Sequence, residues 1–431
     1  MRSDAVERML RSAYSAVLYL LLPITIYHLV WRGFRQRGYF QRWSERYGYY
    51  PGAAPEGRST IWLHAVSVGE VSAAAPLVDA LLDRRPQVPL VITTITPTGS
   101  ERVRALWGDR VRHVYLPYDL PGAMRRFLAQ FRPACALLME TELWPNLLFA
   151  CHDAGIPVSI VNARLSERSL RGYQVLAPLI RRALRTVRRV CAQGHADAKR
   201  YLRLGARAEA TVETGNLKYD VAELGGLDGF VAAFRAQAGA RPVWIAASTH
   251  PDEETAVLAA HRALRLAYPD ALMLWAPRHP ERFKAAYEQA RSFGFRTHSR
   301  AYHPWPAQDD AVFVVDTLGE LGRFYACADA AFVGGSLQPI GGHNLLEPAA
   351  VGVPILSGPH LHNFTDIARQ LSTAGAMKIV DGPEMLGERL VELLGADDMR
   401  VQMGEAGRAL VVDGRGALER TWQAIVDSLP D

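Results

Sequence analysis

Carboxylates follow two apolar runs in the first half of the chain. Glu70 ends the segment HAVSVGE, and Glu140 and Glu142 lie in the segment METELWPN, each directly after an apolar run. A carboxylate in such a place can act as a general base if it reaches the proton that it takes. The dipole of a helix also favours a glutamate in the first helical turn. Taken alone, helix capping explains Glu70 better than catalysis does, but capping accounts less well for two acids in METELWPN.

A basic pair follows an apolar run in the second half. Arg278 ends the run ALMLWAPR, and His279 comes directly after it. Arginine can grip a phosphate with two parallel hydrogen bonds, which makes this position suitable for an anionic ligand. A surface ion pair between Arg278 and Glu281 would explain the arginine equally well.

The segment GGSLQPIGGHNLLEPAAVGVP, residues 334–354, is rich in glycine and is expected to lead into a helix. Glycines before a helix allow a phosphate to approach backbone N–H groups. Glu347 in the first helical turn could accept hydrogen bonds from ribose hydroxyls. A capped glycine-rich turn is the alternative, but it does not explain why glycines, His343 and Asn344 cluster with Glu347 at one strand end.

Parallel strands must position these groups, because short apolar runs alternate with amphipathic segments along the chain. The strands expected in the first half are 59–66, 89–96, 111–117, 134–140, 157–163, 188–194 and 209–215. Those expected in the second half are 242–249, 271–278, 311–318, 330–336, 353–359 and 376–382. The pattern pauses over 217–241. We therefore expect two Rossmann-like α/β lobes that face a cleft, with ligands beyond the carboxyl ends of the strands.

Composition and missing motifs exclude several classes of protein. With 431 residues, 49% of them hydrophobic and 22% charged, the chain is globular and long enough for two or three domains. The net charge of +5 comes almost entirely from arginine and suits anionic partners, but no basic run interleaved with aromatic residues suggests nucleic acid. The sequence lacks a P-loop, a GxGxxG after the first strand of either half, HExxH, GxSxG and DxD. The four cysteines lack metal-ligand spacing and are expected to be reduced.

The amino terminus contains an uncharged segment, Ser12–Trp31, that is long enough to cross about 30 Å of hydrocarbon as a helix. Arginines follow this segment and no cleavage site is evident, so an uncleaved signal anchor with the later residues in the cytoplasm is expected. These arginines are Arg32, Arg35, Arg37 and Arg42. A helix lying partly in the membrane interface is the alternative, because Pro23, Thr25 and His28 weaken a spanning segment.

Six motifs in order resemble the 3-deoxy-D-manno-octulosonic acid (Kdo) transferases over nearly the whole chain. They are HAVSVGE (64–70), METELWPN (139–146), NARLSERS (162–169), TGNLKYD (214–220), APRHPERF (276–283) and GGHNLLEPA (341–349). The resemblance implies a GT-B glycosyltransferase that moves Kdo from CMP-Kdo to the lipid A precursor, lipid IVA, in lipopolysaccharide synthesis. It implies inversion at the sugar, no metal and no cofactor. It also implies an enzyme of the cell inner membrane that contacts membrane lipids, with its catalytic lobes on the cytoplasmic face.

The resemblance also assigns roles to residues. Glu70 is the expected proton acceptor, and Glu140 and Lys218 are the expected transition-state stabilisers, whereas His343 receives no role. The expected CMP-binding residues are Pro277, Arg278, Leu318, Gly319, Glu320, Asn344, Leu345, Leu346 and Glu347. The expected domains are an anchor and basic linker (1–45), an acceptor lobe (46–220) and a CMP-Kdo lobe (221–431).

Two other functions are compatible with parts of the pattern. A UDP-sugar GT-B transferase or 2-epimerase would share the two lobes and the glycine-rich loop, but it would not explain METELWPN together with the amino-terminal segment. A catalytically inactive membrane scaffold that binds a nucleotide sugar is the third possibility. Retention of the acids and bases in every motif argues against such a scaffold.

Overall fold

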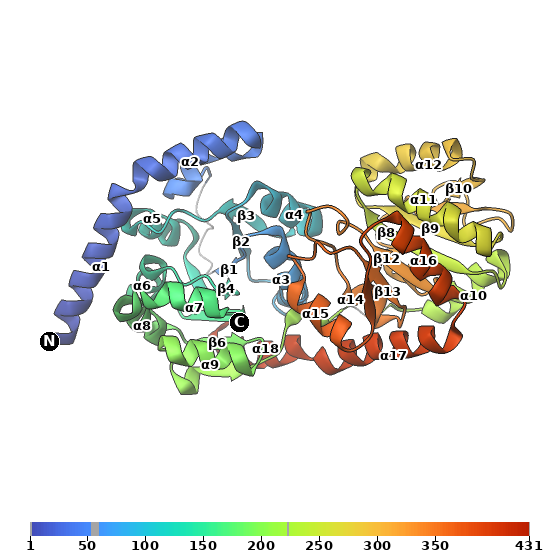
Figure 1. The fold of residues 1–431 in the computed structure, drawn as a ribbon. Helices are drawn as coiled ribbons and strands as arrows, with labels where there is room; N and C mark the ends of the chain where they lie inside the picture. The colour runs from blue at the N-terminus through green and yellow to red at the C-terminus, as the bar shows by residue number, and fades with distance from the viewer. Residues whose placement is uncertain (1, 53–59, 222–223, 431) are drawn as a thin grey trace. The chain divides into compact units, whose positions relative to one another are not determined.

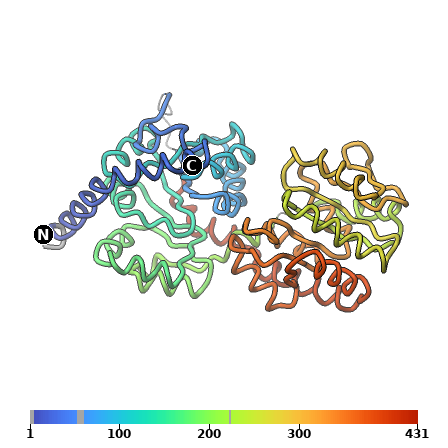
Figure 2. The backbone as a smooth tube through the Cα atoms, turned by 45° about the horizontal axis from the view of Figure 1, so that its top comes forward, coloured from blue at the N-terminus to red at the C-terminus, as the bar shows by residue number. Residues whose placement is uncertain are grey.

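The computed structural model describes residues 2–52, 60–221 and 224–430. The chain forms two compact units, the first made of Met1–Asp220 and Arg415–Asp431 and the second of Val221–Gly414 (Figures 1 and 2). The boundary near residue 220 coincides with the pause in the strand pattern. Residues 415–431 belong to the first unit, whereas the sequence placed them in the lobe 221–431. Each unit is described by itself below, so the expected cleft between two lobes stays a prediction.

The first unit is built on a parallel sheet of seven strands in the order β3-β2-β1-β4-β5-β6-β7. The strands are β1 (Thr60–His64), β2 (Leu90–Thr94), β3 (Arg112–Tyr115), β4 (Pro133–Met139), β5 (Val158–Ala163), β6 (Arg189–Ala192) and β7 (Thr211–Glu213). The central strands β1, β2 and β5 are buried along their whole length, as their continuous apolar runs predict.

Helices cover both faces of this sheet. On one face lie α5 (Pro121–Phe131), α6 (Pro145–Asp153), α7 (Glu167–Gln174), α8 (Ala177–Thr186) and α9 (His195–Leu204). On the other lie α3 (Val68–Arg84), α4 (Pro97–Trp107) and α18 (Ala417–Ile425). Each layer buries its own apolar cluster against the sheet, because alternate side chains of a strand point to opposite faces.

The second unit repeats this plan with a parallel sheet in the order β10-β11-β9-β8-β12-β13-β14. Its strands are β8 (Val243–Thr249), β9 (Leu272–Pro277), β10 (Thr297–Ser299), β11 (Val312–Val314), β12 (Ala330–Val333), β13 (Ile355–Ser357) and β14 (Met377–Ile379). Its helices are α10 (Leu227–Ala238), α11 (Pro251–Ala267), α12 (Phe283–Ser292), α13 (Leu321–Tyr325), α14 (Leu346–Ala350), α15 (Thr365–Thr373), α16 (Pro383–Leu394) and α17 (Asp397–Gly414). Two apolar clusters again lie on opposite faces of the sheet.

Both sheets have a point where the order of the strands reverses along the chain. In the first sheet this point lies between β1 and β4, and in the second it lies between β8 and β12. Loops diverge from the carboxyl ends of the strands at such a point and leave a crevice for ligands. The chemically active residues are therefore expected in the loops that follow these four strands.

The carboxyl-terminal helix α18 completes the core of the first unit. Trp422 and Ile425 are buried in its second apolar cluster. The Asp220 carboxylate accepts hydrogen bonds from the backbone N–H groups of Gly416 (2.7 Å) and Leu418 (2.6 Å), which fixes the start of the helix. The last turns of the chain are thus part of the first unit's fold.

The amino-terminal segment forms two helices, α1 (Arg2–Leu20) and α2 (Leu22–Arg35), where the sequence suggested one. Proline is favourable in the first turn of a helix and unfavourable in its interior, and Pro23 lies in the first turn of α2. Within the described residues no single helix meets the length and apolarity that a membrane span requires. The pair Ala5–Leu20 and Leu22–Arg35 meets both together but is bent by 46°.

Part of α1 is docked on the first unit. The Tyr14 hydroxyl donates to the buried Asp119 carboxylate (3.0 Å), and the Ser15 hydroxyl donates to Asn146 Oδ1 (3.1 Å). Leu10 and Tyr14 also pack against the first apolar cluster. The segment expected to be a separate anchor therefore contributes contacts to the fold of the first unit.

Candidate active site

Glu70 and Glu140 follow adjacent strands at the switch point of the first sheet. Strand β1 pairs with β4, so the loop before α3 and the loop after β4 lie at the same edge of the sheet. Glu70 lies in the first turn of α3, and its carboxylate accepts a hydrogen bond from the backbone N–H of Val66 at 2.8 Å. The Ser67 hydroxyl donates a longer hydrogen bond (3.5 Å) to the other carboxylate oxygen. The capping interpretation of Glu70 is thus correct, and it does not exclude a role as a base, since each oxygen accepts only one such bond.

The negative charge of Glu140 acts on its neighbours Glu70 and Glu142. Burial, and then the negative charge of Glu140, raise the pKa of Glu70 to about 8, with a smaller contribution from Glu142. Burial and Glu140 also raise the pKa of Glu142 to about 7. A carboxyl group with a pKa near neutrality can both take and give a proton under physiological conditions. The sequence placed these acids at one edge of the sheet, and the parallel pairing of β1 with β4 puts the loops that carry them at that edge.

The backbone at Glu140 is strained, with a φ of 53° that a residue with a side chain rarely adopts. Its N–H donates to the carbonyl of Val161 (3.0 Å), and its own carbonyl accepts from the Tyr201 hydroxyl (2.8 Å). Tyr201 is completely buried, so this hydroxyl holds the strained turn from inside the unit. Strain of this kind is characteristic of functional sites, where surrounding contacts keep it in place.

Lys218 lies in a short turn, Leu217–Tyr219, that packs against α3, the helix that carries Glu70. Asn162 at the end of β5 holds this turn, because its Oδ1 accepts the N–H of Leu217 at 3.0 Å. Asn162 is fully buried and has a φ of 51°. Sequence reasoning missed Asn162 as a positioning residue, although asparagine is among the residues that best tolerate this backbone conformation.

His64 is a further residue that sequence reasoning left without a role. Its Nδ1 lies 2.8 Å from the Thr93 hydroxyl, and burial lowers the pKa of the imidazole to about 4, so the ring is neutral. Its Nε2 is buried and has no hydrogen-bond partner within the described residues. The free nitrogen lies at the end of β1, six positions before Glu70 in the chain.

In the second unit, Arg278 follows β9 beside the central strand β8. Its backbone N–H donates to the Thr249 carbonyl (3.0 Å), which fixes the start of the loop. Glu281 lies 3.9 Å from His279 Nδ1, and no ion pair joins Glu281 to Arg278 in the described part of the chain. The Arg278 guanidinium also lacks a hydrogen-bond partner among those residues. The alternative of a surface ion pair is therefore not what the structure shows.

Two histidines meet at the switch point of the second sheet. His250 follows β8 and His343 lies in the loop after β12, and their Nε2 atoms are 2.9 Å apart with parallel rings. Burial, and then the charge of Arg278, lower the pKa of His343 to about 3. Burial also lowers the pKa of His250. One neutral ring thus donates a hydrogen bond to the other, close to an unpaired guanidinium.

Glu253 fixes the glycine-rich loop that leads to His343, and sequence reasoning missed it. The carboxylate is fully buried in the first turn of α11. Its oxygens accept the backbone N–H groups of Gly335 (2.7 Å), Ser336 (2.8 Å) and Leu337 (2.8 Å). The N–H groups of this part of the loop are therefore occupied by the protein's own carboxylate. An acid three residues after a helix start was the available signal.

The other predicted CMP-binding residues are placed around the same edge of the second sheet. Glu320 forms a two-point ion pair with Arg300, with Nε–O and Nη2–O distances of 3.0 and 2.7 Å. Leu318 is exposed, whereas Leu345 and Leu346 are buried, so these two residues can offer only backbone atoms. The Asn344 amide donates to Glu347 Oε1 at 2.9 Å.

The arrangement offers acid–base groups in the first unit and cationic and neutral donor groups in the second. Within residues 2–52, 60–221 and 224–430, no three histidine, cysteine, aspartate or glutamate side chains lie together as metal ligands. The groups present can move a proton and bind an anion.

Comparison with known proteins gives a consistent family. The family model described as "3-Deoxy-D-manno-octulosonic-acid transferase (kdotransferase)" matches residues 41–221. The 3-deoxy-D-manno-octulosonic acid transferase of Haemophilus influenzae is 39% identical over 417 residues, which cover 96% of this chain and 97% of the relative. That of Bordetella pertussis is 40% identical over 437 residues, 97% of this chain and 99% of the relative.

Among solved structures, the UDP-GlcNAc 2-epimerase from Neisseria meningitidis bound to UDP-GlcNAc aligns with a TM-score of 0.51. It is 13% identical, and the alignment covers 86% of this chain and 99% of the epimerase. At this identity the likeness shows the fold alone, a pair of parallel-sheet α/β lobes of the GT-B type. The full-length similarity to the two transferases decides between the alternatives, and the chain belongs to the 3-deoxy-D-manno-octulosonic acid transferase family of glycosyltransferases.

Proposed function

We propose that this glycosyltransferase moves Kdo from CMP-Kdo to a hydroxyl group of the lipid A precursor, without a metal ion. The observation that carries the proposal is the pair of partly buried carboxylates, Glu70 and Glu140, that follow adjacent strands at one sheet edge. The pKa of Glu70 is raised to about 8, in part by the charge of Glu140. An acceptor hydroxyl must lose its proton as it attacks, and a nearby carboxylate is a suitable base.

In this proposal the acceptor oxygen forms a bond to the anomeric carbon of Kdo while the bond from that carbon to the CMP phosphate breaks. Glu70 takes the hydroxyl proton, and CMP leaves with the electron pair as a phosphate monoester. Attack opposite the leaving group inverts the anomeric centre. Glu140 and Lys218 are assigned to the transition state because the first is coupled to Glu70 and the second lies on a turn packed against its helix.

The leaving phosphate is proposed to lie at Arg278, whose guanidinium has no partner in the described part of the chain. A guanidinium beside the phosphate stabilises the negative charge that develops there, which is the role a metal would otherwise fill. Pro277 and the residues 318–320 and 344–347 complete the proposed CMP site, since all follow strands at the same edge.

We also propose that the chain works at the cytoplasmic face of the inner membrane. The support is the pair of helices α1 and α2, which carry many exposed apolar side chains and are followed by arginines. Such a surface suits an anionic membrane that contains the lipid acceptor.

The test is to incubate the purified full-length protein with CMP-Kdo and lipid IVA and to measure product masses. We expect lipid IVA with added Kdo and free CMP, and the same rate in excess EDTA. If no product forms at any donor concentration or in any detergent tried, the proposal is contradicted. If EDTA abolishes activity and Mg²⁺ restores it, the metal-free part of the proposal is contradicted.

A further inference from the structure

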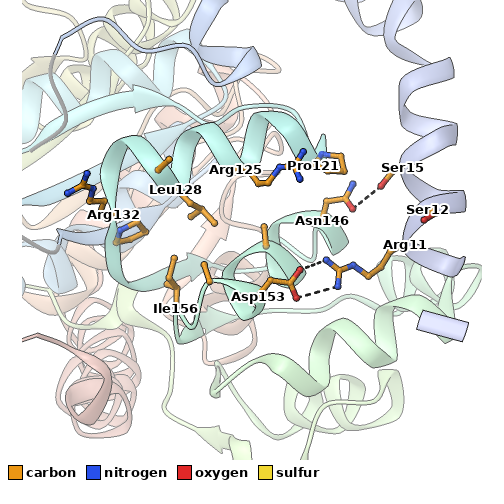
Figure 3. A pocket seen from close by; sticks show the side chains of 14 residues that line it. Arg11, Ser12, Ser15, Pro121, Arg125, Leu128, Arg132, Asn146, Asp153 and Ile156 are labelled. Carbon is orange, nitrogen blue, oxygen red and sulfur yellow. Dashed lines mark hydrogen bonds and ion pairs between the residues drawn. The ribbon is translucent and has the colours of Figure 1, made fainter. Parts of the chain in front are cut away.

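A groove on the first unit lies outside the proposed active site. It has a volume of about 780 Å³ and runs between α5 and α6, with α1 across one end (Figure 3). This volume falls in the range of small-molecule sites. Its lining combines apolar side chains with arginines: Arg11, Ser12, Ser15, Pro121, Arg125, Leu128, Ala129, Arg132, Pro133, Asn146, Ala150, Asp153, Ala154 and Ile156.

The charges of the groove are not balanced. Arg11 is paired with Asp153, and it also lies 3.6 Å from Glu7. Arg125 and Arg132 are exposed and have neither a hydrogen bond nor an ion pair within the described residues. Two positive charges therefore remain without a protein partner within the described residues: Arg125 within α5, and Arg132 directly after its last residue, both on the lining of the groove.

Arg132 occupies a position where arginine is unfavourable. It ends α5 in the left-handed conformation with a φ of 44°, where glycine or asparagine is usual. A strained backbone conformation in a residue with a long side chain points to a function when that side chain has no partner within the protein. Here the guanidinium stands at the far end of the groove from α1 in Figure 3.

The floor between these arginines is apolar. Leu128 and Ala129 of α5, Ala150 of α6 and Ile156, which follows α6, all line the groove. An apolar channel with unpaired guanidinium groups at its ends matches an amphiphile that has hydrocarbon chains and a phosphate. The groove adjoins α1, which leads into the exposed apolar side chains of α2.

The groove is too far from the proposed base to hold the reacting hydroxyl beside Arg132. Arg132 directly precedes β4 and Glu140 directly follows it, so the two residues lie at opposite ends of a strand, about 25 Å apart. A lipid held near Arg132 is therefore a different molecule from the lipid that reacts.

We propose that this groove binds one anionic glycerophospholipid, whose acyl chains cover the apolar floor while the positive charges of Arg125 and Arg132 draw its single phosphate to one end of that floor. The bound lipid fills the space between α1 and the body of the first unit. It thereby links that unit to the membrane in addition to the helices themselves. The inference concerns binding and does not depend on the transfer reaction.

The test uses the full-length protein in a neutral detergent, titrated with dioleoyl phosphatidylglycerol or dioleoyl phosphatidylcholine, with bound lipid counted by native mass spectrometry. We expect one phosphatidylglycerol bound at least about tenfold more tightly than phosphatidylcholine, and a loss of about tenfold in the double variant Arg125→Gln/Arg132→Gln. The matched control is Arg185→Gln/Arg188→Gln, which removes the same charge from exposed positions outside the groove. This control should bind as the natural protein does.

A second variant separates the acyl floor from the charges. Ala129→Phe fills the groove without changing charge, and we expect it to weaken binding of phosphatidylglycerol while melting temperature stays within a few degrees. Inorganic phosphate at millimolar concentration should not compete, because it lacks the chains. Equal binding of both lipids, equal losses in the two double variants, unchanged binding in Ala129→Phe, or competition by phosphate would each overturn the proposal. Transfer activity is not a readout here, so failure of the proposed function would leave these results standing.

Discussion

The two units place their active groups by the same rule and give them opposite electrostatic character. In the first unit the switch point between β1 and β4 holds Glu70 and Glu140, and burial together with the charge of Glu140 raises the pKa of Glu70 to about 8. In the second unit the switch point between β8 and β12 holds His250 and His343, which burial and Arg278 keep neutral. The sheet topology thus decides where chemistry occurs, and the side chains decide which chemistry it is.

The backbone supports this difference. Strained residues stand at the carboxyl edges of both sheets, Glu140 with a φ of 53° in the first and Ser248 with a φ of 55° in the second. In the first unit a tyrosine hydroxyl holds the strained turn, whereas in the second the Glu253 carboxylate holds the neighbouring loop through backbone N–H groups. In the second unit the acid Glu253 thus has a structural role, whereas in the first unit the acid Glu70 is proposed to react.

The largest effect is expected for Glu70→Gln. The amide keeps the shape of the side chain but accepts no proton, so turnover should fall by about 10²–10⁴-fold while CMP affinity stays unchanged. The measurement is single-turnover product formation together with calorimetric titration of CMP. Glu101→Gln, which changes an exposed glutamate on α4, is the control and should behave like the natural protein. Turnover of Glu70→Gln near the natural rate would remove Glu70 from the mechanism.

The Glu70→Gln variant should also change the pH dependence of the protein's thermal stability. The folded pKa of Glu70 is about 8, above its ordinary value of 4.5, so the folded state binds the proton more tightly than the unfolded chain. Stability from this group is therefore present below about pH 4.5 and is lost as the pH rises through 8. Glu70→Gln should consequently melt at a higher temperature than the natural protein at pH 9, with a smaller difference at pH 5. Scanning calorimetry at both values measures this, and a lower melting temperature at pH 9 would contradict it.

A smaller effect, on the other unit, is expected for Arg278→Ala. Loss of charge-assisted hydrogen bonds to phosphate should weaken CMP binding by about 10- to 100-fold. The shape of the pH profile should not change, because the titrating base belongs to the first unit. Titration calorimetry and the pH dependence of turnover give the two readouts, and Arg291→Ala on α12 is the control. Natural CMP affinity in Arg278→Ala would contradict the proposed phosphate position.

The smallest effect is expected for His343→Ala. The variant removes one neutral hydrogen-bond partner of His250, close to the charge of Arg278 where the phosphate of CMP is proposed to lie. We expect CMP affinity to fall by about two- to tenfold. His343→Gln retains a hydrogen-bonding group and should lose less. Binding titrations at pH 6 and pH 8 should give the same ratio of affinities, since His343 is neutral at both. A ratio that changes between these values would show that the histidine pair titrates in this range.

The sequence predicted the sheets and part of the candidate site, but it did not predict the residues that hold the loops in place. The strand runs and the acids or glycines after them predicted the two sheets and the positions of Glu70 and Arg278, because parallel strands end at one edge. Asn162 and Glu253 escaped because their roles depend on bonds to segments tens of residues away. Residues 415–431 belong to the first unit because Trp422 is buried in its core. The amphipathic pattern of a helix predicts that one face is buried, but it does not predict against which unit that face packs.

The prediction of a single amino-terminal helix was wrong for a different reason. An uncharged run of the right length suggested one anchor helix, yet α1 ends at Leu20 and uses Tyr14 to bind a buried aspartate. Pro23 was the local signal for a break. Docking of the polar side of α1 required knowledge of Asp119, which a hydropathy pattern does not contain.

The most direct test of the central claim is the pH dependence of single-turnover transfer, with CMP-Kdo and lipid acceptor saturating, in the natural protein and in Glu140→Gln. The claim is that Glu70 acts as a base whose pKa is raised first by burial and then by Glu140. The rate should rise with pH through a single ionisation at about 8, and Glu140→Gln should move that ionisation to lower pH even though it slows the reaction. A rate that is flat between pH 6 and pH 9, or an ionisation that stays in place when Glu140 loses its charge, would contradict the account.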